Sequence, residues 1–274
     1  MRSIGLWRRR TAVLMALALT LVLAPTAAIA STVGRDDFTI SGEQRAEIGY
    51  SAETDAAFAN VVQVRRARRT YLFTDSESIT ATSPCSLSGR TARCDVPRAS
   101  HVVDISTGER GDRVTIVGSV PTEVDGGPAD DVLLGGTAAD VVFGAEGNDV
   151  LRGSRGNDAL HGLEHNDRLS GNSGRDVLHG DDGRDRLSGG RGNDSLDGGP
   201  EDDVLSGGRG DDALAGDGGE NRLSGGAGDD RIWATPGGRD VVSCGRGFDY
   251  AFVSRNDRVV GCERVFRPSA RRPR

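Results

Sequence analysis

The chain has 274 residues, of which only 36% are apolar and 4% aromatic, so it offers little material for a conventional hydrophobic core. Forty glycines strengthen this point. All 34 basic residues are arginine, and 41 acidic residues outnumber them, which argues against nucleic acid as a partner.

Residues 1–30 have the features of an export signal. Four arginines lie among the first ten residues, an apolar run covers residues 12–24, and the segment ends in Ala28-Ile29-Ala30. We expect cleavage after Ala30 and a secreted, extracellular mature chain without a membrane span. An uncleaved anchor is the alternative, but the apolar run is shorter than the roughly 20 residues that a spanning helix needs. The Arg9-Arg10 pair leaves the twin-arginine route open beside the general one.

Residues 31–125 are predicted to form a small N-terminal β domain. Short, β-branched stretches at residues 60–64, 70–73, 101–105 and 113–117 are separated by glycine, serine and charged residues, which is typical of strands. His101 is the only histidine of this segment and has no identifiable nucleophile partner. A catalytic site of the Ser/His/Asp kind is therefore unsupported.

Four cysteines in an exported chain indicate disulfides. Cys85 and Cys94 bracket a Ser88-Gly89 turn and are predicted to staple a hairpin, which leaves Cys244 and Cys262 as the second pair. Three pairings of four cysteines are possible, and locality alone favours this one.

Residues 126–233 are built of twelve consecutive nonapeptides, from GGPADDVLL to GGAGDDRIW. Position one is glycine and position eight is Leu, Val or Ile in all twelve, and position four is glycine in eight. Position six is aspartate in eleven, and Asn221 is the exception. This segment holds 23 acidic residues and 10 arginines, so it must stay unfolded or bring in cations.

Each constant position has a physical reason. Glycine allows positive φ and close approach of the backbone to a ligand, and one aliphatic residue flanked by polar ones forms the smallest strand with one side chain pointing inward. A turn, an acid and a three-residue strand, repeated, predict a parallel β-solenoid, or β-roll, in which two repeats make one coil. Coils stacked about 4.8 Å apart would place repeat n over repeat n+2.

The stacking predicts two columns of carboxylates. One column holds Asp131, Asp149, Asp167, Asp185 and Asp203 and ends at Asn221; the other holds Asp140, Asp158, Asp176, Asp194, Asp212 and Asp230. Carboxylates at this spacing repel each other unless a cation lies between them. The turns offer carboxylates and backbone carbonyls, and this set of hard oxygen ligands suits Ca²⁺. Twelve repeats contain ten stacked pairs, so ten ions of this type is the upper limit.

The repeats resemble the RTX, or hemolysin-type, calcium-binding nonapeptide, whose pattern is G-G-x-G-x-D-x-U-x. The resemblance covers residues 126–233 and implies that the position-six aspartates and turn carbonyls hold Ca²⁺ between stacked turns. Leu163, His165 and Glu201 replace glycines of the pattern, as do Ala129 and Ala138, and these departures weaken particular sites. Twelve inward aliphatic residues cannot by themselves offset the ordering of the whole repeat segment, so we expect binding and folding to be coupled.

The stretch HGLEH, residues 161–165, matches the H-x-x-E-H motif of one class of zinc metalloproteases. That motif needs a helix to bring both histidines to one face. The nine-residue register instead places a strand end and a glycine-led turn here, so we expect no peptidase. His179 lies one coil after His161 on the same outer face, where an exposed pair is the simpler interpretation and adventitious binding of a transition metal the alternative.

Residues 234–274 are predicted to form a degenerate cap with a basic tail. After one inserted residue, Asp240 and Asp249 return to position six, and Cys244 and Cys262 lie two repeats, or one coil, apart. The segment weakly resembles the cysteine-ended tails of secreted actinobacterial calcium-binding proteins.

The whole sequence thus predicts an all-β, non-catalytic, secreted calcium-binding protein in which a small β domain precedes the solenoid. The rival interpretation is a secreted hydrolase or adhesin whose functional surface lies on residues 31–125, with the solenoid as folding aid or spacer. A protein or polysaccharide partner and the oligomeric state are left open.

Overall fold

The computed structural model describes residues 111–119, 121–234 and 238–267 in full, and upstream of them the backbone of eight strands between residues 37 and 106. The described part is all β and contains no helix. In particular, no helix within it has the length and hydropathy to span a bilayer. The predicted signal peptide and the tail from residue 268 onward lie outside the described residues.

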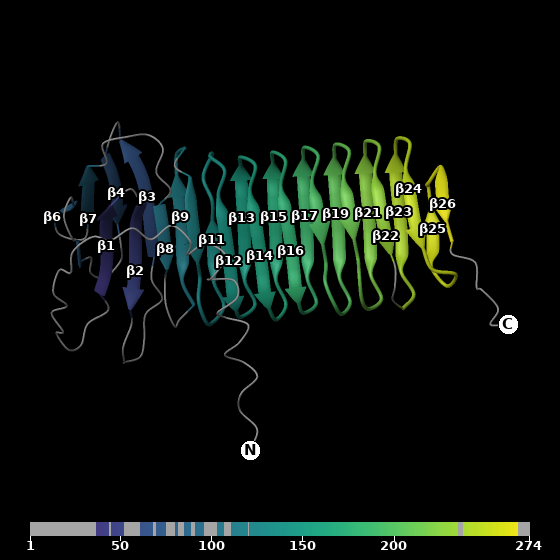
Figure 1. Cartoon of the computed structure of the whole chain (residues 1–274), viewed down its shortest axis with the longest axis horizontal. Helices are drawn as coiled ribbons and strands as arrows, with labels where there is room; N and C mark the ends of the chain where they lie inside the picture. The colour runs from purple at the N-terminus through teal and green to yellow at the C-terminus, as the bar shows by residue number, and fades with distance from the viewer. Residues whose placement is uncertain are drawn as a thin grey trace, which may run out of the picture. The chain divides into compact units, whose positions relative to one another are not determined.

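Two sheets, named sheet A and sheet B, contain all the named strands (Figure 1). Sheet A contains β1 (Asp37–Glu43), β2 (Arg45–Ser51), β5 (Thr80–Ala81), β8 (Val103–Ser106), β10 (Thr122–Asp125), β12 (Val141–Glu146), β14 (Ala159–Glu164), β16 (Val177–Asp182), β18 (Ser195–Asp197), β20 (Ala213–Ala215), β22 (Arg231–Ala234), β24 (Tyr250–Val253) and β26 (Arg264–Phe266). Sheet B contains β3 (Val61–Ala67), β4 (Thr70–Thr74), β6 (Cys85–Ser88), β7 (Thr91–Asp95), β9 (Arg113–Val117), β11 (Val132–Leu134), β13 (Val150–Arg155), β15 (Arg168–Ser173), β17 (Arg186–Arg191), β19 (Val204–Arg209), β21 (Arg222–Ala227), β23 (Val241–Arg246) and β25 (Arg258–Val260).

Consecutive repeats lie on opposite sheets, and each strand pairs in parallel with the strand one coil away. In sheet B, Leu151 of β13 lies opposite Leu169 of β15, and in sheet A, Leu160 of β14 lies opposite Leu178 of β16. Both steps span two repeats. The predicted parallel β-solenoid with two repeats per coil is therefore confirmed.

Most strands are longer than the three residues that the sequence pattern predicts. β13 continues from position seven of one repeat to position three of the next, and its last pair joins Arg155 to Ser173 of β15. The reason is that the backbone after the position-one glycine still pairs with the neighbouring coils. Only β11, β18 and β20 among the strands of the twelve repeats have the predicted three residues.

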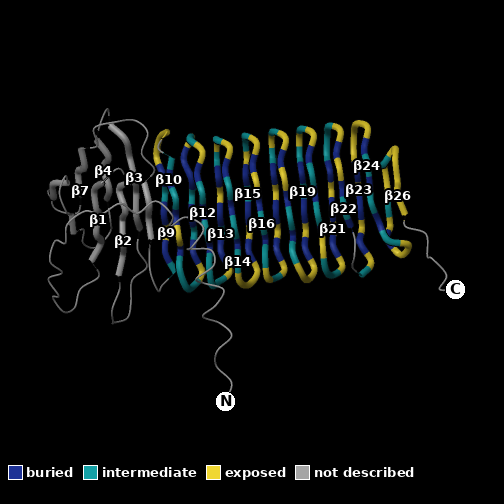
Figure 2. The backbone as a smooth tube through the Cα atoms, in the orientation of Figure 1, coloured by how far each residue is buried: buried dark blue, intermediate teal, exposed yellow. Residues whose placement is uncertain are grey.

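The core between the sheets is a double row of aliphatic side chains. Every position-eight residue of the twelve repeats points inward and is at most 2% exposed, as the dark tube segments of Figure 2 show. Burial alternates along each strand, and β13 has the sequence intermediate, buried, exposed, buried. The period of two therefore places this one side chain inward, as predicted.

The ladders continue upstream of the predicted domain boundary at residue 125. Val124 of β10 pairs with Val142 of β12, Val114 of β9 pairs with Leu133 of β11, and β9 pairs in turn with β3. Because the strand pairing crosses residue 125 without a break, the pairing does not mark a boundary there, and a separate domain over residues 31–125 stays a prediction. In the hairpin of β6 and β7, Cys85 lies opposite Cys94, but their side chains are outside the described set and their disulfide also stays a prediction.

Downstream, the solenoid continues into the predicted cap. β23 to β26 extend both ladders, with Val242 and Ala251 buried in line with the core. Cys244 and Cys262 form a disulfide with a Cα–Cα distance of 5.1 Å, the pairing that their spacing of one coil predicts. The bond ties the last coil to the one before it.

Position four has left-handed backbone in eleven of the twelve repeats, with Ala138 as the exception, which explains why glycine is common there. His165 occupies this position with a φ of +82° and is exposed. We predict that His165→Gly raises the free energy of unfolding of the calcium-saturated chain by about 0.5–1 kcal/mol, because a left-handed non-glycine residue is strained.

The matched control is Glu164→Gly, one residue earlier. Glu164 is also exposed but lies in β14 without positive φ, so glycine there should lower stability by about 0.5–1 kcal/mol. Urea unfolding in millimolar calcium measures both variants. Equal changes in the two would contradict the assignment of strain to His165.

Candidate metal centre

The eleven position-six aspartates, here called the ladder aspartates, lie inside the solenoid where turns meet strands. They are Asp131, Asp140, Asp149, Asp158, Asp167, Asp176, Asp185, Asp194, Asp203, Asp212 and Asp230, each at most 2% exposed. Asn221 is fully buried at the equivalent position. The structure therefore brings every predicted ligand residue into one of two columns, and it points their side chains inward.

One carboxylate oxygen of each ladder aspartate accepts a hydrogen bond from the coil before it. The backbone N–H of Asp149 donates to Oδ1 of Asp167 at 2.7 Å, and that of Asp158 donates to Oδ1 of Asp176 at 2.9 Å. The same bond recurs along both columns at 2.7–2.9 Å within the repeats. These bonds hold each side chain in one orientation.

Both columns are longer than predicted. Asp112 and Thr122 precede them and donate to Asp131 and Asp140, respectively. The expectation that Asn221 ends its column is wrong, because its N–H donates to Oδ1 of Asp240 at 2.7 Å. The steps from Asp112 to Asp131 and from Asn221 to Asp240 are one residue longer than a coil, whereas Thr122 lies a regular coil of 18 residues before Asp140 but is not an acid.

The second carboxylate oxygen has no hydrogen-bond partner in ten of the eleven ladder aspartates, as far as the described residues show. Asp140 is the exception, because its Oδ2 accepts the N–H of Gly136 at 2.7 Å. The ten buried, unpartnered Oδ2 atoms belong to Asp131, Asp149, Asp158, Asp167, Asp176, Asp185, Asp194, Asp203, Asp212 and Asp230. A buried anionic oxygen without a partner is strongly unfavourable, so each needs a proton or a cation.

The position-one glycines leave room for this second oxygen. A Cβ on Gly144 would overlap Oδ2 of Asp149, and it would also lie 2.8 Å from the carbonyl oxygen of Gly162 in the next coil. The same arrangement recurs at Gly162, where a Cβ would meet Oδ2 of Asp167 and the Gly180 carbonyl. Carboxylate and carbonyl oxygens thus converge on a space that any other residue would fill.

Asn221 shows what this space requires. Its side-chain Nδ2 lies beside Gly216, as Oδ2 does beside the other position-one glycines, and donates to the carbonyl oxygens of Gly216 at 2.8 Å and Gly218 at 2.6 Å. The amide N–H₂ group supplies two donors to two backbone acceptors. A ladder aspartate presents an acceptor at the same place, so positive charge is missing there.

Burial shifts the acidity of the ladder aspartates. It raises the pKa of Asp131, Asp167 and Asp203 to about 8, and neighbouring carboxylates add to the effect although the ladder hydrogen bonds oppose it. Burial likewise raises the pKa to about 7 for Asp158 and Asp212, and to about 6 for Asp149, Asp176, Asp185 and Asp230. The ionised form is therefore unfavourable in the fold unless a cation accompanies it.

The donor set of these sites fits a hard cation. It consists of carboxylate and backbone carbonyl oxygens, which suit Ca²⁺ with its six to eight flexible oxygen ligands. The described residues contain no cluster of three or more acidic, histidine or cysteine side chains. An ion held here would therefore take many of its ligands from the backbone, and one or two carboxylates from the ladder.

A second column, in the turns, was missed by sequence reasoning. Position five is Asn or Asp in eight repeats, and its side-chain oxygen accepts the position-five N–H of the next coil, as Asp130 does from Asn148 at 2.7 Å and Asp211 from Asp229 at 2.9 Å. These side chains are exposed and tie the turns together. The enrichment at position five was the available signal.

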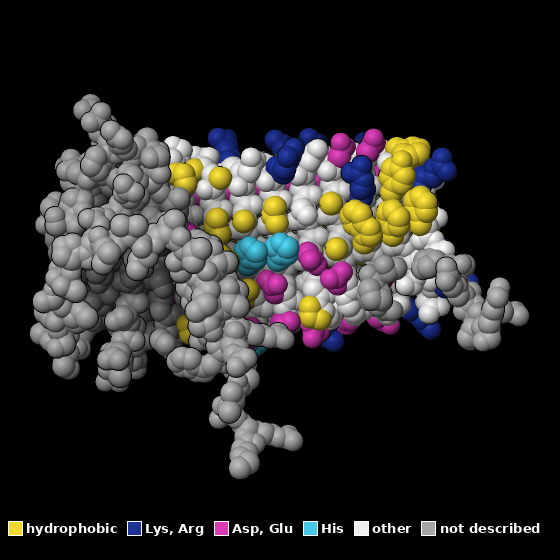
Figure 3. Space-filling view, in the orientation of Figure 1, with side chains coloured by type: hydrophobic (Ala, Val, Ile, Leu, Met, Phe, Trp, Pro, Cys, Tyr) yellow, Lys and Arg dark blue, Asp and Glu magenta, His cyan; other side chains and the backbone are white. Residues whose placement is uncertain are grey.

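The stretch HGLEH forms no helical metal site. His161 and Glu164 lie in β14, and His165 follows in the turn. The ring of His161 stacks on that of His179 with a centroid distance of 5.0 Å on the outer face of sheet A (Figure 3). The motif therefore has no counterpart in this fold.

These features define the class: a parallel β-solenoid of nonapeptide coils with a buried carboxylate ladder along each edge. The family model of the RTX calcium-binding nonapeptide repeat matches the chain in four copies, at residues 125–160, 161–196, 197–232 and 215–251. Residues 125–251 thus consist of RTX calcium-binding nonapeptide repeats. No curated protein matches the chain.

Proposed function

We propose that this chain is a secreted, non-enzymatic protein that binds several Ca²⁺ ions through the ladder aspartates and folds on binding them. The main support is the contrast between Asn221, whose amide donates to two turn carbonyls, and the ladder aspartates, which present a buried oxygen at the same place. Ca²⁺ would supply the missing positive charge. The carboxylate and the turn carbonyls would hold it.

Coupled folding follows from the thin core. Each coil buries only two position-eight side chains between the sheets, and it buries two carboxylates beside them. Burial of so little apolar surface cannot offset both the ordering of the chain and the desolvation of the acids. The binding energy of the ions therefore becomes folding energy.

The length of the two columns sets an upper limit on the number of bound ions. Ten is the limit for stacked pairs within residues 126–233, but Asp112 and Asp240 extend one column beyond the repeats and Asp249 extends the other. Secretion is proposed from residues 1–30 and agrees with weak sites, because extracellular calcium modules commonly have Kd values of roughly 10⁻⁴–10⁻³ M.

The test replaces three ladder aspartates of one column: Asp149→Asn, Asp167→Asn and Asp185→Asn. Each new amide should donate to turn carbonyls as Asn221 does, so the variant should fold but bind about three fewer Ca²⁺ ions. Equilibrium dialysis with elemental analysis of calcium counts the ions. Circular dichroism checks the fold.

The matched control is Asp202→Asn, Asp211→Asn and Asp229→Asn. These position-five residues are exposed, and the change in net charge is the same. The control should lose no ion. The reverse variant, Asn221→Asp, should gain an ion and destabilise the metal-free chain. Equal stoichiometry in all four proteins would refute the ladder aspartates as ligands.

A further inference from the structure

We propose that the outer face of sheet B binds an acidic polysaccharide lying along the solenoid axis. The outer surface of β13, β15, β17, β19, β21 and β23 is here called the arginine face. The proposal goes beyond calcium binding, because it concerns the outside of the solenoid and the ladder aspartates lie inside.

Charge is separated between the two sheets, although the repeats as a whole are acidic. The six strands of the arginine face carry eight arginines and no acidic residue. The six strands β12, β14, β16, β18, β20 and β22 of sheet A carry five acidic residues and one arginine, Arg231. The separation arises because consecutive repeats alternate between sheets, so a charge pattern that recurs every second repeat places most arginines on sheet B and the acidic strand residues on sheet A.

The eight arginines are exposed, and none forms an ion pair with an acidic side chain of the described residues. Two pairs lie directly opposite each other in neighbouring strands, Arg168 with Arg186 and Arg191 with Arg209. Like charges directly opposite each other in a sheet are destabilising. An anion bound between them would remove this repulsion.

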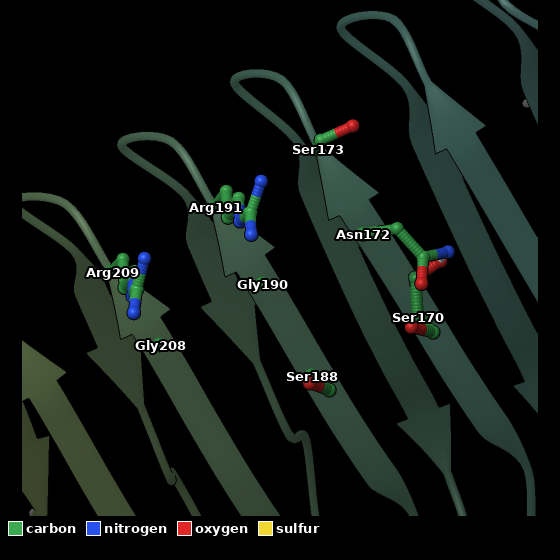
Figure 4. A pocket seen from close by; sticks show the side chains of 8 residues that line it. All are labelled: Ser170, Asn172, Ser173, Ser188, Gly190, Arg191, Gly208 and Arg209. Carbon is green, nitrogen blue, oxygen red and sulfur yellow. Dashed lines mark hydrogen bonds between the residues drawn. The ribbon is translucent and has the colours of Figure 1, made fainter.

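A shallow hollow lies in the middle of the arginine face, over β15, β17 and β19 (Figure 4). Its rim carries Arg191 and Arg209 at the ends of their strands, and Gly190 and Gly208 leave space beside them. Ser170 and Ser188 line the other side, in a column that continues through Ser206. Charged donors and serine hydroxyls therefore face one hollow across three neighbouring strands.

The chemistry favours an acidic polysaccharide. The hollow spans β15, β17 and β19, and the row of exposed arginines continues from β13 to β23. This row covers five coil spacings of about 4.8 Å, roughly 24 Å, so it fits an extended chain with regularly spaced carboxylates. Guanidinium groups bind carboxylates through paired hydrogen bonds, and serine hydroxyls suit sugar hydroxyls. The six strands carry no aromatic residue on which nucleic-acid bases could stack.

Fluorescence anisotropy of labelled hyaluronan oligosaccharides tests the proposal, with the calcium-saturated chain. We expect binding that weakens with added NaCl, and no binding of dextran, a neutral polysaccharide. The double variant Arg191→Gln, Arg209→Gln should weaken binding about tenfold or more. Circular dichroism should show that the variant keeps its strands.

The matched control is Arg184→Gln, Arg231→Gln, which changes the net charge equally. Arg184 pairs with Asp202 in the turns at 3.4 Å and Arg231 lies in sheet A, so hyaluronan affinity should stay unchanged. The proposal would be overturned by no binding by the wild type, by equal losses in both variants, or by equally tight binding of a single-stranded oligonucleotide. Self-association that depends on Arg191 and Arg209, without hyaluronan binding, would make the face a contact between copies and would also overturn it.

Discussion

Chelation of calcium should abolish the β-sheet circular dichroism of the solenoid and restore it on readdition. The reason lies in the ten buried Oδ2 atoms that have no partner among the described residues. Without a cation, each column places carboxylates one coil, about 4.8 Å, apart in a poorly hydrated interior, where their repulsion is strong. The thin core cannot compensate for this repulsion.

Magnesium at the same concentration should restore the signal poorly, because it demands near-ideal octahedral geometry and gives up water reluctantly. The measurement is a titration of the chelated chain with each ion, followed by thermal unfolding. Equal order and equal melting temperature with and without calcium would contradict the cation requirement. The triple ladder variant offers an internal check, since it should retain more order than the wild type in chelator.

The metal-free chain should regain strand structure as the pH falls. Burial raises the pKa of the ladder aspartates in the fold to about 6 for Asp149, about 7 for Asp158 and about 8 for Asp167, against 3.8 for the ordinary group. A folded state that holds protons more tightly than the unfolded state is favoured at low pH. The metal-free fold should thus be most stable below pH about 4 and lose stability as the pH rises through 6 to 8.

Calcium binding should show the opposite dependence. Protons and Ca²⁺ compete for the same carboxylates, so the calcium affinity of the folded chain should weaken as the pH falls from 8 to 6. Circular dichroism of the chelated chain across this range, and calcium titrations at each end, measure both effects. Strand content of the chelated chain that increased with pH would show that the ladder carboxyls do not carry the effect.

The architecture could be predicted because the repeat is nearly perfect. Constant residues at positions one, six and eight define the turn, the acid and the inward side chain, and the coil of two repeats follows from two turns. The direction of the Asp158 side chain could not be predicted in the same way. The period shows which residues stack. Only the structure shows that the backbone N–H of Asp140 donates to Oδ1 of Asp158, while Oδ2 of Asp158 has no hydrogen-bond partner among the described residues.

Other features were hidden where the period is broken or doubled. Asp112 joins its column across a step one residue longer than a coil, and β10 has Thr122 in the place of an acid, so neither fits a nonapeptide pattern. The separation of Arg186 and Arg191 from the acidic strands of sheet A follows a period of two repeats, which a search with the single repeat averages away. Contacts in these cases depend on which residues lie one coil apart, and where the period is broken only the structure shows these pairs.

The ladder hydrogen bonds give the solenoid a polarity. Each position-six N–H finds its acceptor in the following coil, and the last two find theirs in the cap, where Asp257 accepts from Asp240 and Glu263 from Asp249. When the chain is synthesised from its N-terminus, the position-six N–H groups of each new coil therefore have no acceptor until the following coil has been made. The cap supplies the last acceptors. A chain that lacks its final few dozen residues would therefore end in a coil whose position-six N–H groups have no acceptor.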